Sequence, residues 1–213
     1  MKNLIIIGAG GMGRAIYNIA IGCEGYGTEY KVKGFLDDDI HQLDSFTGYP
    51  PVLDTIAGYA IQPDDVFTCS IGEVPTKVRC CEIIQGKGGK FITLIHKQSR
   101  VCSNVTLGDG CIVAPFCLVD CDTVVGKLCL LQSDAVIGHD CVIGDYTRID
   151  THVTCVGGVK IGSRATIHTS AVLNHKVVVE DDAIVGACSF VIRKVKQGTT
   201  VCGNPAKTLK FRF

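Results

Sequence analysis

An aliphatic side chain returns at every sixth position through nearly half of this chain, and this repeat constrains the fold more than any other feature. The series fills sixteen positions with Val, Ile or Leu, except for Cys155, whose thiol behaves as a small hydrophobe when buried. Its members are Val101, Leu107, Val113, Val119, Val125, Leu131, Ile137, Ile143, Ile149, Cys155, Ile161, Ile167, Leu173, Val179, Val185 and Val191. An unbroken six-residue period is typical of a parallel β-helix.

A compact side chain stands two residues before each aliphatic one, and residues two apart share one face of a strand. Each hexapeptide is therefore expected to be a short strand with one small and one large group pointing inward. The position after the aliphatic residue is often Gly, or Asp or Asn at 120, 150 and 174, which favours a sharp turn there. Three six-residue strands per coil would stack residues 18 apart at roughly 4.8 Å per coil. The flat faces of such a prism favour side-by-side association.

Of the thirteen cysteines, the five at inward positions of the repeat are expected to be reduced structural thiols, and no metal is expected. Cys111, Cys117, Cys129 and Cys141 occupy the small inward position of the repeat, and Cys155 occupies the large one. The count is odd and no C-x-x-C pair occurs, which disfavours a zinc site or a disulfide framework.

Charge and hydropathy exclude other classes of partner. Lys plus Arg equals Asp plus Glu at 21 each, so no net field attracts nucleic acid. The apolar run near the start, Leu4 to Ile7, is too short for a signal peptide, and no stretch is long enough for a membrane span. We expect a cytoplasmic protein.

Residues 1–97 lack the repeat and predict a small Rossmann-like α/β domain, followed by the β-helix over 98–196 and a C-terminal tail over 197–213. Alternating strands and helices give a parallel sheet. The expected strands are 4–7, 30–36, 66–71 and 91–95, and the expected helices are 14–22 and 73–85.

The loop Gly8-Ala9-Gly10-Gly11-Met12-Gly13 fits G-x-G-x-x-G between a strand and a helix, a setting in which backbone approaches a phosphate. An acidic residue is expected about 20 positions later in a dinucleotide site, whereas Asp37 is 29 beyond Gly8. A domain of this size suits one nucleotide better than two. A glycine turn that only packs the helix on the sheet is the remaining alternative.

Five separated motifs together resemble the hexapeptide-repeat sugar O-/N-acyltransferases, in particular the bacillosamine-pathway N-acetyltransferase and sialic acid O-acetyltransferase group. They are GAGG-x-G, FLDD (35–38), LIHK (94–97), the hexapeptides and GNPAK (203–207). The resemblance implies a left-handed β-helix, a homotrimer, acetyl-CoA as donor and a sugar or UDP-sugar as acceptor.

The resemblance also implies roles for individual residues. His139 corresponds to the family's general base and Asp140 to the acid that orients it. Arg148 stands where many relatives have a second His near the donor, and Met12 where they commonly have His in the glycine loop. The implied donor contacts are Arg148, Gly157, Thr169 and Ala187, and the implied acceptor contacts are Gly10, Gly11, Met12, Asp37, Asp38 and Gly72.

The repeat tests the histidines independently of the family. His139, His152, His168 and His175 all avoid the inward positions, so none is expected in the core. His152 and His168 suit a solvated or interface position, whereas Gly157, stacked between His139 and His175, is expected to leave an open space for a slender donor arm. A His near neutral pKa can take a proton from an amine or hydroxyl.

Two other functions remain open from the residues alone. One is a non-catalytic scaffold that binds nucleotide-sugars. The other is a zinc carbonic anhydrase of the β-helix type, suggested by the 36-residue spacing of His139 and His175, although a third well-placed His is lacking.

Overall fold

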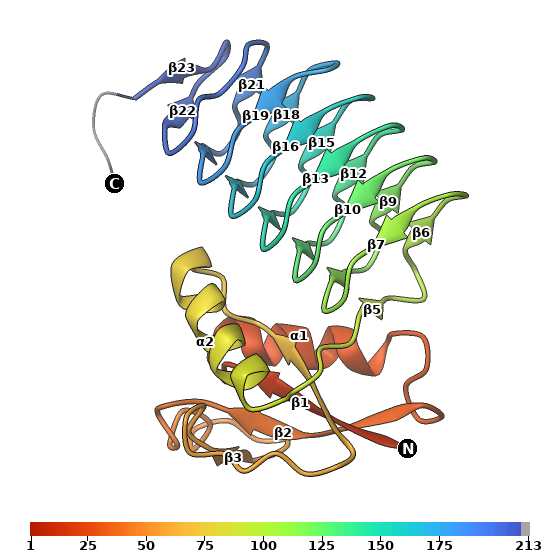
Figure 1. Cartoon of the computed structure of the whole chain (residues 1–213), viewed down its shortest axis with the longest axis vertical. Helices are drawn as coiled ribbons and strands as arrows, with labels where there is room; N and C mark the ends of the chain where they lie inside the picture. The colour runs from red at the N-terminus through yellow and green to blue at the C-terminus, as the bar shows by residue number, and fades with distance from the viewer. Residues whose placement is uncertain (210–213) are drawn as a thin grey trace. The chain divides into compact units, whose positions relative to one another are not determined.

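The structure is a computed structural model that describes residues 1–209, and it consists of two compact units that meet in sequence between His96 and Lys97. Figure 1 shows the α/β unit and the solenoid that follows it in the chain. Within residues 1–209, no helix combines the length and the apolar content that crossing a membrane requires.

The first unit is a parallel sheet with strand order β3-β2-β1-β4. The central strand β1 presents Leu4 to Ile7 as four consecutive fully buried side chains, as expected for a strand covered on both faces. The elements of this unit are β1 (Lys2–Ile7), α1 (Gly11–Ile21), β2 (Tyr30–Leu36), β3 (Val52–Asp54), β4 (Asp65–Cys69), α2 (Val74–Gly86) and β5 (Leu94–Ile95). β3 is not among the strands expected from the sequence, and of the expected strand 91–95 only the last two residues form β5.

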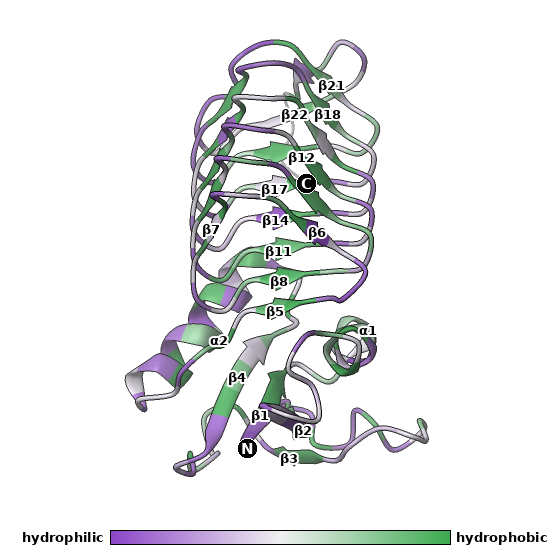
Figure 2. Cartoon of the chain, turned by 90° about the vertical axis from the view of Figure 1, so that its right-hand side faces the viewer, coloured by the Kyte–Doolittle hydropathy of each residue, from purple (hydrophilic) through white to green (hydrophobic). Residues whose placement is uncertain are grey.

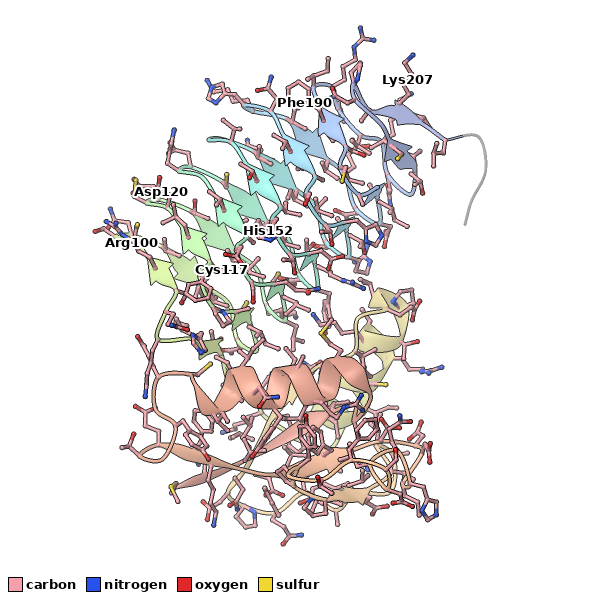
Figure 3. The ribbon with its side chains drawn as sticks, turned by 180° about the vertical axis from the view of Figure 1, so that it is seen from behind. Arg100, Cys117, Asp120, His152, Phe190 and Lys207 are labelled. Atoms are coloured by element: carbon pink, nitrogen blue, oxygen red, sulfur yellow. The ribbon has the colours of Figure 1, made fainter. Side chains whose placement is uncertain are left out.

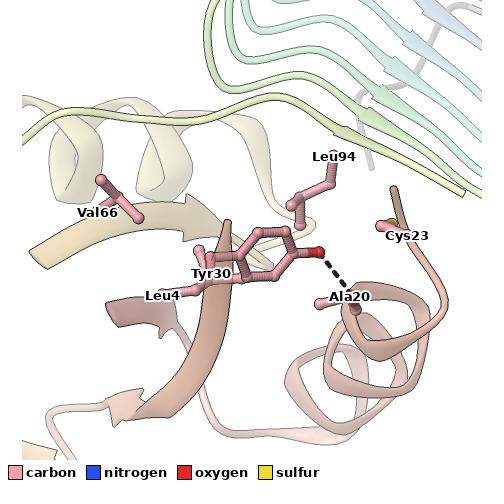
Figure 4. Packing of buried hydrophobic residues seen from close by; sticks show 6 residues of the cluster. All are labelled: Leu4, Ala20, Cys23, Tyr30, Val66 and Leu94. Atoms are coloured by element: carbon pink, nitrogen blue, oxygen red, sulfur yellow. Dashed lines mark hydrogen bonds between the residues drawn. The ribbon is translucent and has the colours of Figure 1, made fainter. Parts of the chain in front are cut away.

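A buried cluster fixes α1 on the sheet of this unit (Figure 4). The Tyr30 hydroxyl, at the start of β2, donates a 2.6 Å hydrogen bond to the carbonyl oxygen of Ala20 in the last turn of α1. Its ring packs with Leu4, Val66 and Leu94, which are at most 5% exposed. The phenol therefore buries apolar area while its one polar atom is satisfied.

The second unit is a left-handed parallel β-helix with three sheets, which confirms the predicted fold class. One sheet contains β7 (Thr106–Leu107), β10 (Val124–Val125), β13 (Val142–Ile143), β16 (Lys160–Ile161) and β19 (Val178–Val179). The second contains β8 (Ile112–Val113), β11 (Leu130–Leu131), β14 (Arg148–Ile149), β17 (Thr166–Ile167), β20 (Ile184–Val185), β22 (Thr200–Cys202) and β23 (Lys207–Thr208). The third contains β6 (Arg100–Val101), β9 (Leu118–Val119), β12 (Val136–Ile137), β15 (Thr154–Cys155), β18 (Val172–Leu173) and β21 (Phe190–Val191).

The strands stack coil upon coil, with hydrophobic residues recurring along the stack (Figure 2). Ile137 pairs with Cys155 and Ile143 with Ile161, so aligned residues are 18 apart, as the repeat predicts. These inward side chains are at most 2% exposed. The aliphatic column supplies the apolar burial that stabilises the solenoid.

The corners turn at a different place from the predicted one. Left-handed backbone recurs three positions after the aliphatic residues, for example φ 58° at Asp140 and at Arg164. The glycine directly after the aliphatic residue is needed for a different reason. A Cβ at Gly144 would lie 2.6 Å from the carbonyl carbon of Gly162 one coil on, and a Cβ at Gly108 would lie 2.6 Å from the backbone nitrogen of Lys127. These glycines allow neighbouring coils to approach closely.

The segment expected as a C-terminal tail carries two strands. β22 continues one solenoid sheet by pairing in parallel with β20, and β23 pairs with β22 in the antiparallel sense. Residues 210–213, the end of that predicted tail, lie outside the described residues.

Candidate active site

His139 lies on a solenoid corner, directly after β12 and one coil below Gly157. Its Nδ1 atom is 2.6 Å from Oδ2 of Asp140, and both side chains are more than half exposed. Asp140 has a left-handed backbone, which Asp tolerates better than most residues, and this corner geometry brings the two neighbouring side chains together. The structure therefore pairs the two residues that sequence analysis predicted as base and orienting acid.

Negative charge surrounds this imidazole. The hydrogen bond to Asp140 is the main cause that raises the pKa of His139. Desolvation opposes this rise, and the charges of Asp140, Asp120 and Asp122 add to it. Asp120 projects from the corner one coil below (Figure 3). His139 is thus a stronger base than an isolated histidine.

The partner of Nδ1 determines the role of the other ring nitrogen. A carboxylate accepts hydrogen bonds, so Nδ1 carries the proton in the neutral ring and Nε2 presents a lone pair. A Cβ added at Gly157 would lie 2.6 Å from Cε1 of His139. The expected open space at Gly157 is therefore filled by the His139 ring itself, and the buried glycine fixes where Nε2 lies.

In the first unit, the glycines of the loop after β1 divide into two kinds. Gly8 has φ 95°, and a Cβ at Gly13 would lie 2.9 Å from the Gly8 carbonyl carbon, so these two glycines shape the turn and let α1 approach β1. Around Gly10 nothing lies within 4 Å of an added Cβ. Gly10 is also the N-cap of α1 and makes no side-chain cap. The open loop can approach a phosphate.

Two acidic residues predicted to bind the acceptor hold backbone in this structure. The Asp37 carboxylate accepts hydrogen bonds from the backbone of Ala9 at 2.7 Å and of Asp39 at 3.0 Å. Asp38 accepts from the backbone of Ile56 at 3.2 Å. Asp37 therefore braces the glycine loop directly. Three other predicted acceptor contacts, Gly11, Met12 and Gly72, lie in the first turn of α1 and just after β4.

Arg148, predicted as a donor contact, is the outward residue of β14 and is held by a carboxylate. Its Nε and Nη2 atoms lie 2.6 Å and 3.0 Å from the two oxygens of Asp150. Asp150 also accepts a 2.6 Å bond from the Gln132 amide and lies 3.0 Å from Nδ1 of His168. Asp150 was expected to be a turn residue, and His168 was expected to be solvated or at an interface. The signal that was missed is that 132, 150 and 168 are 18 apart and therefore stack.

The other predicted donor contacts, Thr169 and Ala187, are exposed on the corner that follows this sheet. Ala187 borders a cavity of about 460 Å³ in the solenoid, whose surface is mostly apolar. The cavity is also lined by His168, Gly186, Thr200, Cys202 and Leu209. Within residues 1–209, no group of three or more His, Cys, Asp or Glu side chains is arranged to hold a metal ion.

Comparison with known proteins determines the family. The model of the PglD N-terminal domain matches residues 3–84. The GDP-perosamine N-acetyltransferase of Escherichia coli O157:H7 is 30% identical over 149 residues, which are 68% of this chain and 67% of the relative. This chain belongs to the sugar N-acetyltransferases. The predicted family is therefore confirmed, and the chain is an acyltransferase.

Two further matches agree with this assignment. The UDP-N-acetylbacillosamine N-acetyltransferase of Bacillus subtilis (strain 168) is 27% identical over 117 residues, covering 53% of this acetyltransferase and 51% of the relative. The acetyltransferase domain of PglB from Neisseria gonorrhoeae FA1090, solved in complex with acetyl coenzyme A, superposes with a TM-score of 0.87 and 27% identity. That match covers 98% of this chain and 99% of the solved chain.

Proposed function

We propose that this acetyltransferase moves the acetyl group of acetyl-CoA to the amino group of a nucleotide-linked sugar, with His139 as general base. The observation that carries the proposal is the 2.6 Å contact between His139 Nδ1 and Asp140, which leaves Nε2 as the basic atom on an exposed corner. An N-acetyl product is favoured over an O-acetyl one because both named relatives are N-acetyltransferases.

The reaction follows from this geometry. The sugar amine attacks the thioester carbonyl carbon while Nε2 of His139 takes the amine proton, as a positioned general base does. The tetrahedral intermediate collapses, the C–S bond breaks, and the imidazolium returns its proton to the departing thiolate. An amide and free CoA result. The oxyanion needs a hydrogen-bond donor, which a backbone N–H or the Arg148 guanidinium supplies.

The glycine loop of the first unit is assigned to the acceptor. Gly10, Gly11 and Met12 belong to the open N-terminus of α1, where backbone N–H groups and the helix dipole favour a diphosphate. Asp37 contributes by holding Ala9, and Asp38 and Gly72 flank the same strand ends. Gly157, Thr169 and Ala187 are assigned to the donor.

A homotrimer in the cytoplasm completes the proposal. The solenoid exposes aliphatic side chains on its outer surface, among them Val124 and Val142 on neighbouring strands and Val156 and Ile192 on one corner. Exposed aliphatic side chains that recur on neighbouring strands support side-by-side packing of subunits. None of the thirteen cysteines, which all lie within residues 1–209, is in a disulfide, as suits a reducing compartment. Sedimentation equilibrium at micromolar concentration should give three chains, and a monomer would contradict the assembly.

The activity is tested by incubating the protein with acetyl-CoA and a panel of GDP- and UDP-linked amino sugars. Products should be detected by mass spectrometry, because a thiol reagent would also react with exposed cysteines such as Cys188. We expect one acceptor to gain a single acetyl group and an equal amount of CoA to form. Acceptor binding without transfer would instead support the non-catalytic scaffold.

A further inference from the structure

A buried carboxylate joins three polar side chains on one corner of the solenoid. The Asp150 side chain is 5% exposed, and both of its oxygens are used. Oδ1 accepts from Gln132 and from Nε of Arg148, and Oδ2 accepts from Nη2 of Arg148 and lies 3.0 Å from Nδ1 of His168. A buried charge this well surrounded orients its partners strongly, because each bond is charge-assisted and screened little by water.

Two of these partners are presented outward. Arg148 is bound through two guanidinium nitrogens, so the plane of its fork is fixed. His168 donates through Nδ1 to a carboxylate oxygen, so its Nε2 is the hydrogen-bond acceptor of the neutral ring. The His168 side chain is 39% exposed and borders the cavity of about 460 Å³.

The proposed trimer would place this cluster opposite the catalytic base. When a rotation axis parallel to the solenoid relates the subunits, a given residue lies at the same height along that axis in every subunit. Each coil of 18 residues rises about 4.8 Å. Arg148 is nine positions beyond His139 (148 minus 139), half a coil and roughly 2.4 Å in height. Within one subunit, His139 comes after β12 of one sheet, whereas Arg148 lies in β14 of another sheet. A neighbouring copy can therefore bring His139 to the level of Arg148.

We propose that Asp150 is a positioning residue of the donor site, holding Arg148 toward the thioester carbonyl and His168 Nε2 toward an amide N–H of the pantetheine arm. This inference rests on the proposed function. The cavity beside His168 is mostly apolar, which suits the alkyl parts of the arm, while His168 supplies a fixed acceptor. Asp150 itself, being buried, contacts neither substrate.

The test uses Asp150→Asn and His168→Gln in the full-length protein. For Asp150→Asn we expect the KM for acetyl-CoA to rise about tenfold, the loss expected for charge-assisted hydrogen bonds. The acceptor KM should change less than twofold. His168→Gln should raise the donor KM by a smaller factor and should leave the fold intact, because the side chain is partly exposed. Thermal unfolding reports any loss of structure.

A matched control separates positioning from structural support. Arg164 and Asp182 also form a two-bond ion pair, at 2.7 Å and 2.9 Å, on another corner. This pair joins stacked coils, and its side chains are 39% and 43% exposed. Asp182→Asn should leave both KM values unchanged. A tautomer measurement by nitrogen NMR gives a second readout: Nδ1 of His168 should carry the proton in the native protein and lose this preference in Asp150→Asn.

The outcomes are distinguishable. An active native protein whose donor KM is unchanged in both Asp150→Asn and His168→Gln would overturn this inference alone. A donor KM that rises equally in Asp182→Asn would show a general structural effect and would also overturn it. A native protein that transfers acetyl to no acceptor would overturn the proposed function first.

Discussion

The solenoid holds two histidine–aspartate pairs that differ in almost every physical respect. His139 and Asp140 are sequence neighbours on an exposed corner, and the acid raises the pKa of the imidazole. His168 and Asp150 are 18 residues apart, and their carboxylate is buried and shared with Arg148 and Gln132. An exposed pair can exchange protons with a substrate, whereas a carboxylate that is buried and bonded through both oxygens can only orient its partners. In the proposed mechanism, burial of the carboxylate therefore decides whether the same two residue types act in proton transfer or in positioning.

The largest effect should come from removing the exposed base. For His139→Ala we expect kcat to fall by a factor of about 10² to 10⁴, the usual range for a positioned general base. The KM for acetyl-CoA should move far less, because proton removal matters in the transition state. Steady-state kinetics measure both constants. Full activity in this variant would show that the exposed pair does not provide the general base. His152, on another corner (Figure 3), would then be the next candidate.

The placement of the base can be disturbed without touching it. In Gly157→Ala the added Cβ would overlap the His139 ring, the movable end of a side chain, so the ring should shift while the coil stays folded. We expect a fall in kcat of about 10², as for a displacement of about 1 Å. Gly144→Ala is the control: its Cβ meets backbone, so it should lower the melting temperature more and kcat less. Equal kcat in native protein and Gly157→Ala would contradict this account of the glycine.

Changing the acid of the exposed pair should alter pH dependence. Because the hydrogen bond to Asp140 raises the pKa of His139, Asp140→Asn should lower it. The imidazole of His139 then stays neutral to lower pH, so the acid limb of the kcat/KM profile should shift to lower pH. The plateau should fall about tenfold, since a weaker base removes the proton less readily. An acid limb at an unchanged pH would show that another group controls the profile.

Arg148→Ala should have an effect no larger than that of Asp140→Asn and should act on use of the donor. If the guanidinium contacts the acetyl carbonyl, kcat/KM for acetyl-CoA should fall about tenfold, consistent with one lost charge-assisted hydrogen bond. The KM for the sugar should stay nearly constant. Because Arg148→Ala also leaves Asp150 without its main partner, Arg148→Lys serves as the comparison. Lys keeps the positive charge but lacks the planar guanidinium that binds both carboxylate oxygens. Loss of sugar affinity rather than donor use would contradict the assignment.

The sequence predicted the parts of the molecule that depend on local pattern. The aliphatic period indicated the β-helix because inward side chains recur with the coil, and β2 matches its expected range, 30–36. The pairing of His139 with Asp140 was foreseen because neighbouring residues on a corner necessarily lie close. The roles of all the predicted site residues stay predictions, since they concern bound substrates.

The remaining features depend on which way side chains turn, and pattern alone does not determine this. Asp150 occupies a position where Asp usually marks a turn. Here its carboxylate is instead buried, and its partners are Gln132 and His168 from the adjacent coils and Arg148 from its own coil. Gly157 was expected to leave a space, but a flexible imidazole fills it. Asp37 is predicted to contact the acceptor, and nothing in the sequence indicated that its carboxylate also holds the backbone of the glycine loop. Each of these features depends on a contact between residues distant in sequence or on the rotamer that a side chain adopts.

Because every coil of the solenoid rises by the same amount, distances along the proposed donor site are multiples of the rise of one coil. Gly186, on the cavity, lies 36 positions (186 minus 150) and hence two coils above Asp150, a span of roughly 10 Å. Inserting or deleting one residue would reverse the inward pattern, whereas removing one whole coil would preserve it and shorten the span by about 4.8 Å. The length of the donor that fits along this corner can therefore change only by the rise of whole coils.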